Sequence, residues 1–405
     1  MRVLHTSDWH LGHALHELPR DREHAAFVAW LLDVIEAEAI DAVLVTGDVF
    51  DAGNPPAGAL ATWFGFLAEV HRRRPTATVV AIAGNHDSPA RLTAPAAVLA
   101  GVRAHVVGTL PRGAYGGLDA DRLLVPLTDD AGVVRAWAAA VPFLRPGELD
   151  LGGPGGATRA VFAAAVAAAQ ARRTPEQAIV VLGHLHLTAG ALVGSERAIG
   201  GVEALAAGDL GDQVAYVALG HLHRAQRIGA DHVRYAGSPI PLAMGEAGYR
   251  HQVVLVELAG PRVSEIRTLE VPRAVELLRV PPRGAAPPAE VLATLAGLPP
   301  LDPTVPPELR PFLEVAVALD APAPRLHAQV EAAVRDRHVR LVKLGAEPVG
   351  DRQPLAATPP PEALAQLDPR EVLRRRWHSV HGGEVPAPVA AAFAQLLREV
   401  NEAPS

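Results

Sequence analysis

The chain has 405 residues, a formal net charge of −7 and no cysteine. The length suffices for two or three domains with substantial cores, and the lack of cysteine excludes disulfides, thiolate zinc sites and cysteine nucleophiles. The negative charge argues weakly against a nucleic-acid partner without excluding one, and the absence of a signal-peptide pattern or a bilayer-spanning apolar stretch predicts a soluble cytoplasmic protein with no membrane contact.

Five short apolar runs lie in the first part of the chain, and each is followed by residues that bind metals. Their length and their Gly and polar boundaries predict strands buried on both faces, and ligands in such sheets bind beyond the carboxyl ends of the strands. One such string alone occurs by chance and usually lies in a turn, whereas five in order at strand ends indicate a site. The strings are Asp8-x-His10, Gly47-Asp48, Gly84-Asn85-His86-Asp87, Gly183-His184 and Gly220-His221-x-His223.

Three helices are predicted between these strands. The first has Asp21 as its N-cap and an apolar face at helical spacing, and the second opens at Asn54-Pro55-Pro56. The third covers Thr158–Arg173, with Thr158 as its N-cap. Shorter strand patterns are Leu123–Leu127, Ala136–Val141, His232–Tyr235 and Val253–Leu258. The fold class we expect is α/β, with a two-sheet sandwich flanked by helices over residues 1–268.

The remainder of the chain is predicted to form smaller parts. A Pro/Gly-rich boundary at Pro281–Pro288 precedes a β-α-β pattern, which we interpret as a small α/β accessory domain over residues 269–350. A Pro-rich linker over 351–366 leads to a tail over 367–405 with two short amphipathic helices, one starting at Asp368-Pro369 and one after Pro388. Such helices either pack back on the domain or dock on a partner, and their spacing favours neither.

The candidate ligands are too many for one ion, and carboxylate with imidazole suits Mn, Fe or Zn. We predict two ions that share Asp48, an arrangement that cleaves phosphate esters with the ions about 3.5–4 Å apart. The proposed ligand sets are Asp8, His10, Asp48 and His223 for one ion, and Asp48, Asn85, His184 and His221 for the other. The glycine before four of these ligands is interpreted as a sharp bend at the strand end.

His86 follows the candidate ligand Asn85 and is predicted to lie beside the ions without binding them. There it would steady the phosphorus or protonate the leaving oxygen as a catalytic residue. Two interpretations of Asp87 remain open: it orients His86, or it caps the next turn.

Other histidines are weighed against these roles. His186 is the alternative to His184 as a ligand, and His184 is preferred. His5 is expected to pack within the first strand. Three more are expected at surface positions rather than in the cleft: His13, His16 and His24.

The five strings resemble those of the calcineurin-like metallophosphoesterases. Four longer strings are similar, within that superfamily, to the bacterial SbcD nucleases, counterparts of the double-strand-break repair nuclease of eukaryotes and archaea. They are Thr6–Gly12, Gly47–Asp51, Gly84–Ser88 and Tyr235–Leu242. The resemblance covers about residues 1–265.

The resemblance implies a nuclease with two divalent metal ions, Mn²⁺ above others. It implies 3′-to-5′ exonuclease activity on double-stranded DNA and endonuclease activity on DNA ends and hairpins, in repair and recombination with the ATPase SbcC. The accessory domain is similar in placement to a DNA-capping domain and the tail to helices that bind SbcC. A homodimer associated with the nucleoid is also implied. Archaeal and eukaryotic relatives carry a phosphate-contacting His where this chain has Asp51, so the group that contacts that phosphate stays open.

Two other functions compete with this one. A small-molecule phosphodiesterase or phosphomonoesterase needs the same metal site, but it needs no long extension after Thr268. A scaffold that clamps SbcC on DNA needs no metal site, yet every metal position in this chain is filled.

Overall fold

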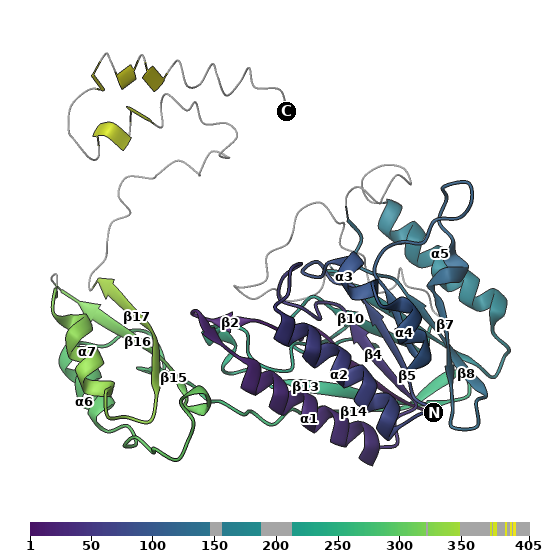
Figure 1. Cartoon of the computed structure of the whole chain (residues 1–405), viewed down its shortest axis with the longest axis horizontal. Coiled ribbons are helices and arrows are strands. Elements are labelled where there is room, and N and C mark those ends of the chain that lie inside the picture. Colours follow the sequence, from purple (N-terminus) through teal and green to yellow (C-terminus); the bar gives the residue numbers. More distant parts are fainter. Residues whose placement is uncertain are drawn as a thin grey trace. The chain divides into compact units, whose positions relative to one another are not determined.

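The computed structural model describes residues 1–145, 156–187, 213–320 and 323–348, together with short segments between 373 and 393. The chain divides into two compact units, Met1–Glu347 and Pro348–Ser405. Most of the first unit is built from two six-stranded sheets with helices outside them (Figure 1).

The first sheet has the strand order β14-β13-β1-β4-β5-β6. Strands β1, β4, β5 and β6 are parallel and lie side by side in chain order. Strand β13 is antiparallel to β1, and β14 is antiparallel to β13. The bounds are Arg2–Thr6 for β1, Ala42–Thr46 for β4, Thr78–Ile82 for β5, Ala104–Val107 for β6, Gln252–Ala259 for β13 and Arg262–Glu270 for β14.

The second sheet has the order β11-β12-β10-β9-β8-β7. Its inner strands β12, β10, β9 and β8 are parallel to one another. The bounds are Leu124–Thr128 for β7, Val134–Ala140 for β8, Ala178–His184 for β9, Tyr216–Gly220 for β10, Gln226–Ile228 for β11 and Ala230–Tyr235 for β12.

Apolar side chains on both faces of each sheet explain why the central strands read as continuous apolar runs. Helices α1 (Asp21–Ala37) and α2 (Ala57–Arg73) share one buried cluster with the first sheet, and α5 (Gly156–Arg172) shares another with the second. A third cluster fills the space between the sheets. The predicted fold class, a two-sheet α/β sandwich flanked by helices, is therefore confirmed.

Two predicted helix caps are wrong. The N-cap of α1 is Arg20, and Asp21 is the first helical residue. There the carboxylate of Asp21 still stabilises the helix, because it lies at the positive end of the helix dipole. Thr158 lies inside α5, which begins at Gly156, and its side chain is buried. A polar side chain inside the first turn has the same local sequence signal as a cap, so spacing alone does not separate them.

The first unit also contains shorter elements. The helices are α3 (Pro89–Thr93) and α4 (Ala96–Gly101). A small hairpin pairs β2 (Ala14–Leu15) with β3 (Leu18–Pro19), and single 3₁₀ turns cover Ala120–Leu123, Met244–Glu246 and Pro307–Leu309.

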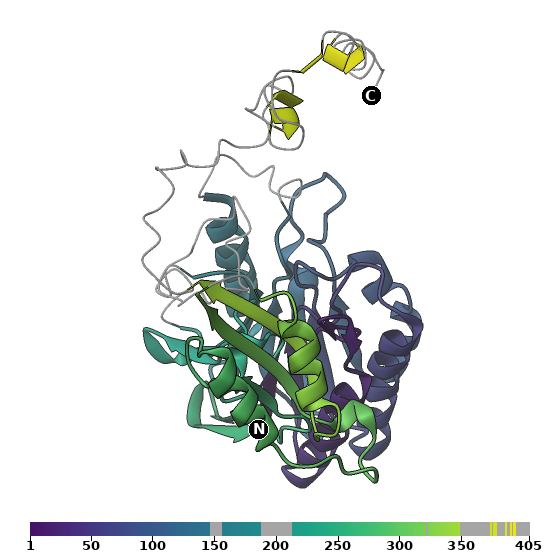
Figure 2. The ribbon, with the colours of Figure 1, turned by 90° about the vertical axis from the view of Figure 1, so that its left-hand side faces the viewer.

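The accessory segment forms a three-stranded sheet of order β15-β16-β17, with two helices beside it (Figures 1 and 2). The β-α-β pattern is present, but the interpretation of Pro281–Pro288 as a boundary misses β15 and α6. Pro288 is the first residue of α6, a position that suits proline because its missing N–H is not needed there. The bounds are Leu277–Val280 for β15, Pro288–Ala296 for α6, Phe312–Leu319 for β16, Leu326–Val334 for α7 and Arg340–Pro348 for β17.

The small sheet contacts the larger domain through Phe312. Its buried ring lies 5.4 Å from the guanidinium of Arg20, at the start of α1, and 3.9 Å from that of Arg340 on β17. Leu15 and Leu277 pack in the same cluster. The contact joins the small sheet to the N-terminal end of α1.

Most of the predicted tail lies outside the described residues, including the linker 351–366 and the helix start at Asp368. Within the described residues, short helical segments occur at 373–374, 376–378, 389–390 and 392–393. None of the helices in the described part is both long and apolar enough to cross a membrane.

Candidate metal centre

The candidate ligands gather where the central strands of the two sheets end. Strands β1, β4 and β5 are neighbours in the first sheet, and β9 and β10 are neighbours in the second. All of these neighbouring strands are parallel, so their carboxyl ends lie at one edge of each sheet. That edge carries Asp8 and His10 after β1, Asp48 after β4, Asn85 after β5, His184 at the end of β9, and His221 and His223 after β10.

The glycines at this edge allow the loops to approach each other closely. A Cβ on Gly84 would lie 2.1 Å from Oδ1 of Asp48, and one on Gly220 would lie 1.9 Å from the carbonyl oxygen of Thr46. Of the four glycines that precede candidate ligands, only Gly47 has a positive φ, at 90°. At Gly84, Gly183 and Gly220 the expectation that glycine relieves backbone strain is therefore wrong, and the missing side chain matters there instead.

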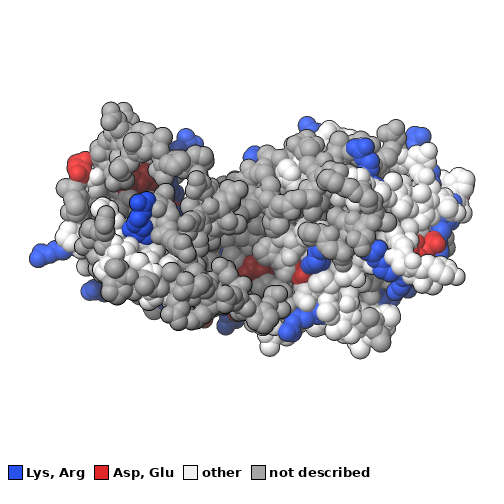
Figure 3. All heavy atoms as spheres, turned by 90° about the horizontal axis from the view of Figure 1, so that it is seen from above, with Lys and Arg blue, Asp and Glu red and all other residues white. Residues whose placement is uncertain are grey.

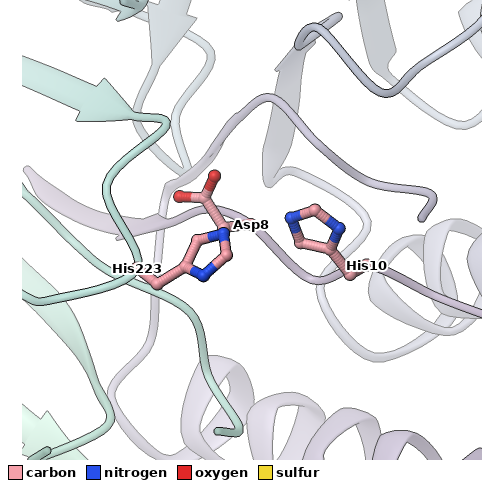
Figure 4. Close-up of side chains that lie close together, drawn as sticks. All are labelled: Asp8, His10 and His223. Atoms are coloured by element: carbon pink, nitrogen blue, oxygen red, sulfur yellow. The ribbon is translucent and has the colours of Figure 1, made fainter. Parts of the chain in front are cut away.

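Asp8, His10 and His223 form one group, with ligand atoms all within 4.8 Å of one another (Figure 4). The Nδ1 atoms of the two imidazoles are held by carboxylates: His10 lies 3.1 Å from Asp51, and His223 lies 3.0 Å from Glu246. Among the described residues, the buried Nε2 of His10 has no hydrogen-bond partner. A buried nitrogen with a lone pair beside a carboxylate is what a cation ligand requires.

A second group surrounds Asn85. Its Oδ1 lies 3.0 Å from Nε2 of His184 and 3.1 Å from Nδ1 of His221. Asp48 lies between the two groups, because its Oδ2 is 3.3 Å from Nε2 of His184 and 3.6 Å from Nε2 of His10. His184, the candidate preferred over His186, makes these contacts. Seven candidate ligand side chains in two groups around one shared carboxylate fit two divalent cations.

The charges in this centre perturb one another strongly. Burial disfavours ionised Asp48, but the nearby His184 and His10 outweigh it and hold the pKa of that carboxyl well below its usual range. Burial also disfavours protonated His184, yet Asp48 raises the pKa of this imidazole to about 9. Burial lowers the pKa of His221 to about 3, with a further contribution from His184. A cation that binds here therefore competes with a proton on His184.

His86 lies at the exposed rim of this centre. Its ring is 4.8 Å from that of His10, and its backbone N–H donates to Oδ1 of Asp48 at 2.9 Å. Nδ1 of His86 donates to the carbonyl oxygen of Asp51 at 2.8 Å. The structure thus places His86 beside the candidate ligands, with one ring nitrogen already engaged.

Asp87 has neither of the roles considered for it. Its buried carboxylate accepts hydrogen bonds from the backbone N–H groups of Phe50, Gly84 and Val49, at 2.9, 2.8 and 3.2 Å. Burial and the neighbouring Asp48 raise its pKa to about 6. Asp87 therefore ties the loop after β4 to the loop after β5.

The remaining histidines divide between packing and support. His5 is packed as predicted, with its ring nitrogens 2.9 Å from the Tyr216 hydroxyl and 3.0 Å from the Thr46 hydroxyl. His16 is exposed, as predicted. The surface prediction is wrong for His24, which is buried. Its Nε2 lies 3.0 Å from the carbonyl oxygen of Trp9, the residue between the candidate ligands Asp8 and His10 in the sequence.

His13 is hydrogen-bonded to Asp51, a contact that the sequence pattern does not predict. Nδ1 of His13 lies 3.0 Å from Asp51, and its Nε2 lies 3.0 Å from the carbonyl oxygen of Leu242. Burial raises the pKa of the Asp51 carboxyl, but hydrogen bonds from His10 and His13 outweigh burial and hold that pKa well below its usual range. Asp51 is therefore a carboxylate that contacts both His10 and His13.

Comparison with known proteins agrees with this geometry. The calcineurin-like phosphoesterase family matches residues 1–225, and the family described as type 5 capsule protein repressor C-terminal domain (SbcD_C) matches residues 273–381. The chain belongs to the calcineurin-like phosphoesterases.

Individual relatives indicate which family within the calcineurin-like phosphoesterases the chain belongs to. The chain is 42% identical over 383 residues to the SbcD subunit of nuclease SbcCD from Rhodobacter capsulatus, a match that covers 91% of this chain and 92% of the relative. It is 34% identical over 287 residues to the protein of the same name in Escherichia coli K12, covering 67% and 68% of the two chains. For the Bacillus subtilis 168 protein of that name, the identity is 34% over 273 residues, covering 64% and 66%. Within the phosphoesterases, the chain belongs to the SbcD family.

Proposed function

We propose that the chain is the nuclease subunit of an SbcCD-type complex, which hydrolyses DNA phosphodiesters with two metal ions. The observation that carries the proposal is the position of Asp48 between His10 and His184, which joins two groups of ligands into one centre. We assign Asp8, His10, Asp48 and His223 to one cation, and Asp48, Asn85, His184 and His221 to the other.

The side chains of this centre have separate tasks. Two bound cations would withdraw charge from the phosphate and lower the pKa of water. His86 is exposed and its Nδ1 is engaged by the Asp51 carbonyl, so its Nε2 is the atom that exchanges a proton. From there it donates to a phosphate oxygen or to the leaving oxygen, as a general acid does.

Carboxylate and imidazole together suit Mn, Fe or Zn. Among these we propose Mn²⁺, because the chain resembles the SbcD nucleases, for which that cation is expected. For the substrate we propose double-stranded DNA ends and hairpins, cleaved as a 3′-to-5′ exonuclease and an endonuclease in repair and recombination. Despite the net charge of −7, basic side chains are spread over the described part of the face in Figure 3. They offer contacts for phosphates.

The partners are proposed from the relatives, whose names place them in SbcCD. We propose that SbcC binds the C-terminal tail, that residues 269–350 cap the DNA, and that the chain acts as a cytoplasmic, nucleoid-associated homodimer.

The test is degradation of a linear DNA duplex with Mn²⁺, Mg²⁺ or EDTA, for the wild type and His86→Ala. We expect Mn²⁺-dependent cleavage that falls about 10²- to 10⁴-fold in the variant while Mn²⁺ binding is kept. Loss of Mn²⁺ from the variant would show that His86 is a ligand instead.

A chromogenic phosphodiester serves as a parallel substrate. If it is hydrolysed with Mn²⁺ while DNA is untouched, even with SbcC and ATP added, a small-molecule esterase becomes the better description. Intact repair function in an Asp48→Ala variant without metal would favour the scaffold.

A further inference from the structure

Glu246 is a buried carboxylate with a contact at each of its two oxygens. Its side chain is 2% exposed, and Oε1 lies 3.0 Å from Nδ1 of His223. Oε2 accepts the backbone N–H of Leu242 at 2.7 Å. A carboxylate held at both oxygens has little freedom to rotate, so it can define the orientation of the imidazole that it contacts.

We propose that Glu246 is a positioning residue of the metal centre, which holds His223 so that its Nε2 faces the cation beside Asp8 and His10. An ionised carboxylate only accepts hydrogen bonds, so Nδ1 of His223 carries a proton, and in the neutral imidazole Nε2 then keeps its lone pair for a cation. A carboxylate behind a metal-binding imidazole also raises its basicity and stabilises its orientation. The inference rests on the proposed function, since it assumes a cation at this position.

The segment Tyr235–Leu242 contacts the backbone of the same loop. Ser238 donates its backbone N–H to the carbonyl oxygen of His223 at 3.0 Å. Gly237 has φ 78°, and a Cβ there would lie 2.6 Å from that same oxygen. The segment contributes no proposed ligand, and these contacts give it a physical role: with Glu246, it clamps both the backbone and the side chain of His223.

The two cation positions are consequently unequal. Behind the Asp8, His10 and His223 group stand two carboxylates, Asp51 and Glu246. In the other group, Nδ1 of His184 faces the carbonyl oxygen of Thr46, at 2.8 Å, which carries no full charge. The group with more negative charge should bind its cation first and more tightly, because the surrounding charge adds to that of the ligands.

The test is calorimetric titration of Mn²⁺ into the metal-free full-length protein. We expect two binding steps in the wild type, of which Glu246→Gln weakens the tighter by about 10- to 100-fold, as the loss of a carboxylate behind a ligand does. Glutamine keeps the size of the side chain, and its amide oxygen can still accept a hydrogen bond from Nδ1 of His223. The substitution therefore removes only the negative charge and the hydrogen bond from the backbone N–H of Leu242. Glu270→Gln is the matched control, since Glu270 is exposed on β14, and it should leave both steps unchanged.

The outcomes separate the two proposals. Two steps of wild-type affinity in folded Glu246→Gln, judged by urea unfolding without metal, would overturn the role of Glu246. Failure of the wild type to bind Mn²⁺ at all would overturn the proposed function beneath it. If Glu246→Gln does not fold, Glu246→Asp decides, since it keeps the charge and withdraws it by one methylene: unchanged affinity there also overturns the proposal.

Discussion

Four candidate ligands have backbone angles that residues with side chains rarely adopt. The φ values are 52° for Asp8, 46° for His10, 48° for Asp48 and 102° for His221. Each such conformation costs about 1–3 kcal/mol, and glycine would avoid it, but glycine has no side-chain ligand atom. The chain therefore retains side chains in unfavourable conformations at the point where they converge, as is expected of a site organised before its ligand arrives.

His5 affects the pH dependence of the protein's stability rather than the metal centre. Burial lowers its pKa to about 3 from 6.5, the value expected in the unfolded chain. Between these values the unfolded state binds more protons than the folded one, so the free energy of unfolding falls as the pH falls through 6.5 toward 3. Each such group contributes a slope of up to about 1.4 kcal/mol per pH unit.

Urea unfolding in EDTA at pH 7.5, 6 and 5 tests this expectation. His5→Gln should be less stable than the wild type at pH 7.5, because the hydroxyls of Tyr216 and Thr46 lose a well-placed partner. Its stability should nevertheless depend less steeply on pH. His24, whose pKa burial likewise lowers to about 3, should retain part of the slope. Equal slopes in the two proteins would contradict the assignment.

At the scale of the elements, the close approach of the loops after β4 and β5, neighbouring strands of the first sheet, depends on a single glycine. Gly84→Ala places a methyl group against Asp48, which is proposed to serve both cations, so we expect Mn²⁺ binding to weaken at least about tenfold at both positions. The measurement is the same calorimetric titration.

Gly65→Ala is the matched control. Gly65 lies within α2, and a Cβ there meets no atom within 4 Å. Alanine should stabilise the helix by about 0.5–1 kcal/mol and leave Mn²⁺ binding unchanged. Normal binding in Gly84→Ala would mean that Asp48 shifts without loss of its role.

The sequence predicts the strands and helices better than the side-chain contacts that hold their loops together. Buried parallel strands that end in ligand residues are visible locally, since run length and the following residues are both short-range signals. The partners of Asp87 and Glu246 are not, because Asp87 contacts a loop 38 positions earlier in the chain and Glu246 contacts His223, 23 positions earlier. The surface prediction for His24 fails for the same reason: its position on a helix gives no sign that a loop covers it.

At the scale of the whole molecule, the chain separates into Met1–Glu347 and Pro348–Ser405. Every proposed ligand and every buried apolar cluster that the structure describes lies in the first unit. Hydrolysis should therefore be independent of the tail, while binding of SbcC should require it.

Deletion of Asp368–Ser405 tests this division of tasks. We expect the shortened chain to bind Mn²⁺ and hydrolyse a chromogenic phosphodiester like the full chain, because neither the ligands nor the cores that support them are touched. We expect it to lose co-elution with SbcC in size-exclusion chromatography, where the full-length chain is the control. Co-elution at full strength would place the SbcC contact on the first unit. Loss of Mn²⁺ binding would show that the tail supports the metal centre. Either result would contradict the assignment of hydrolysis to the first unit and of SbcC binding to the tail.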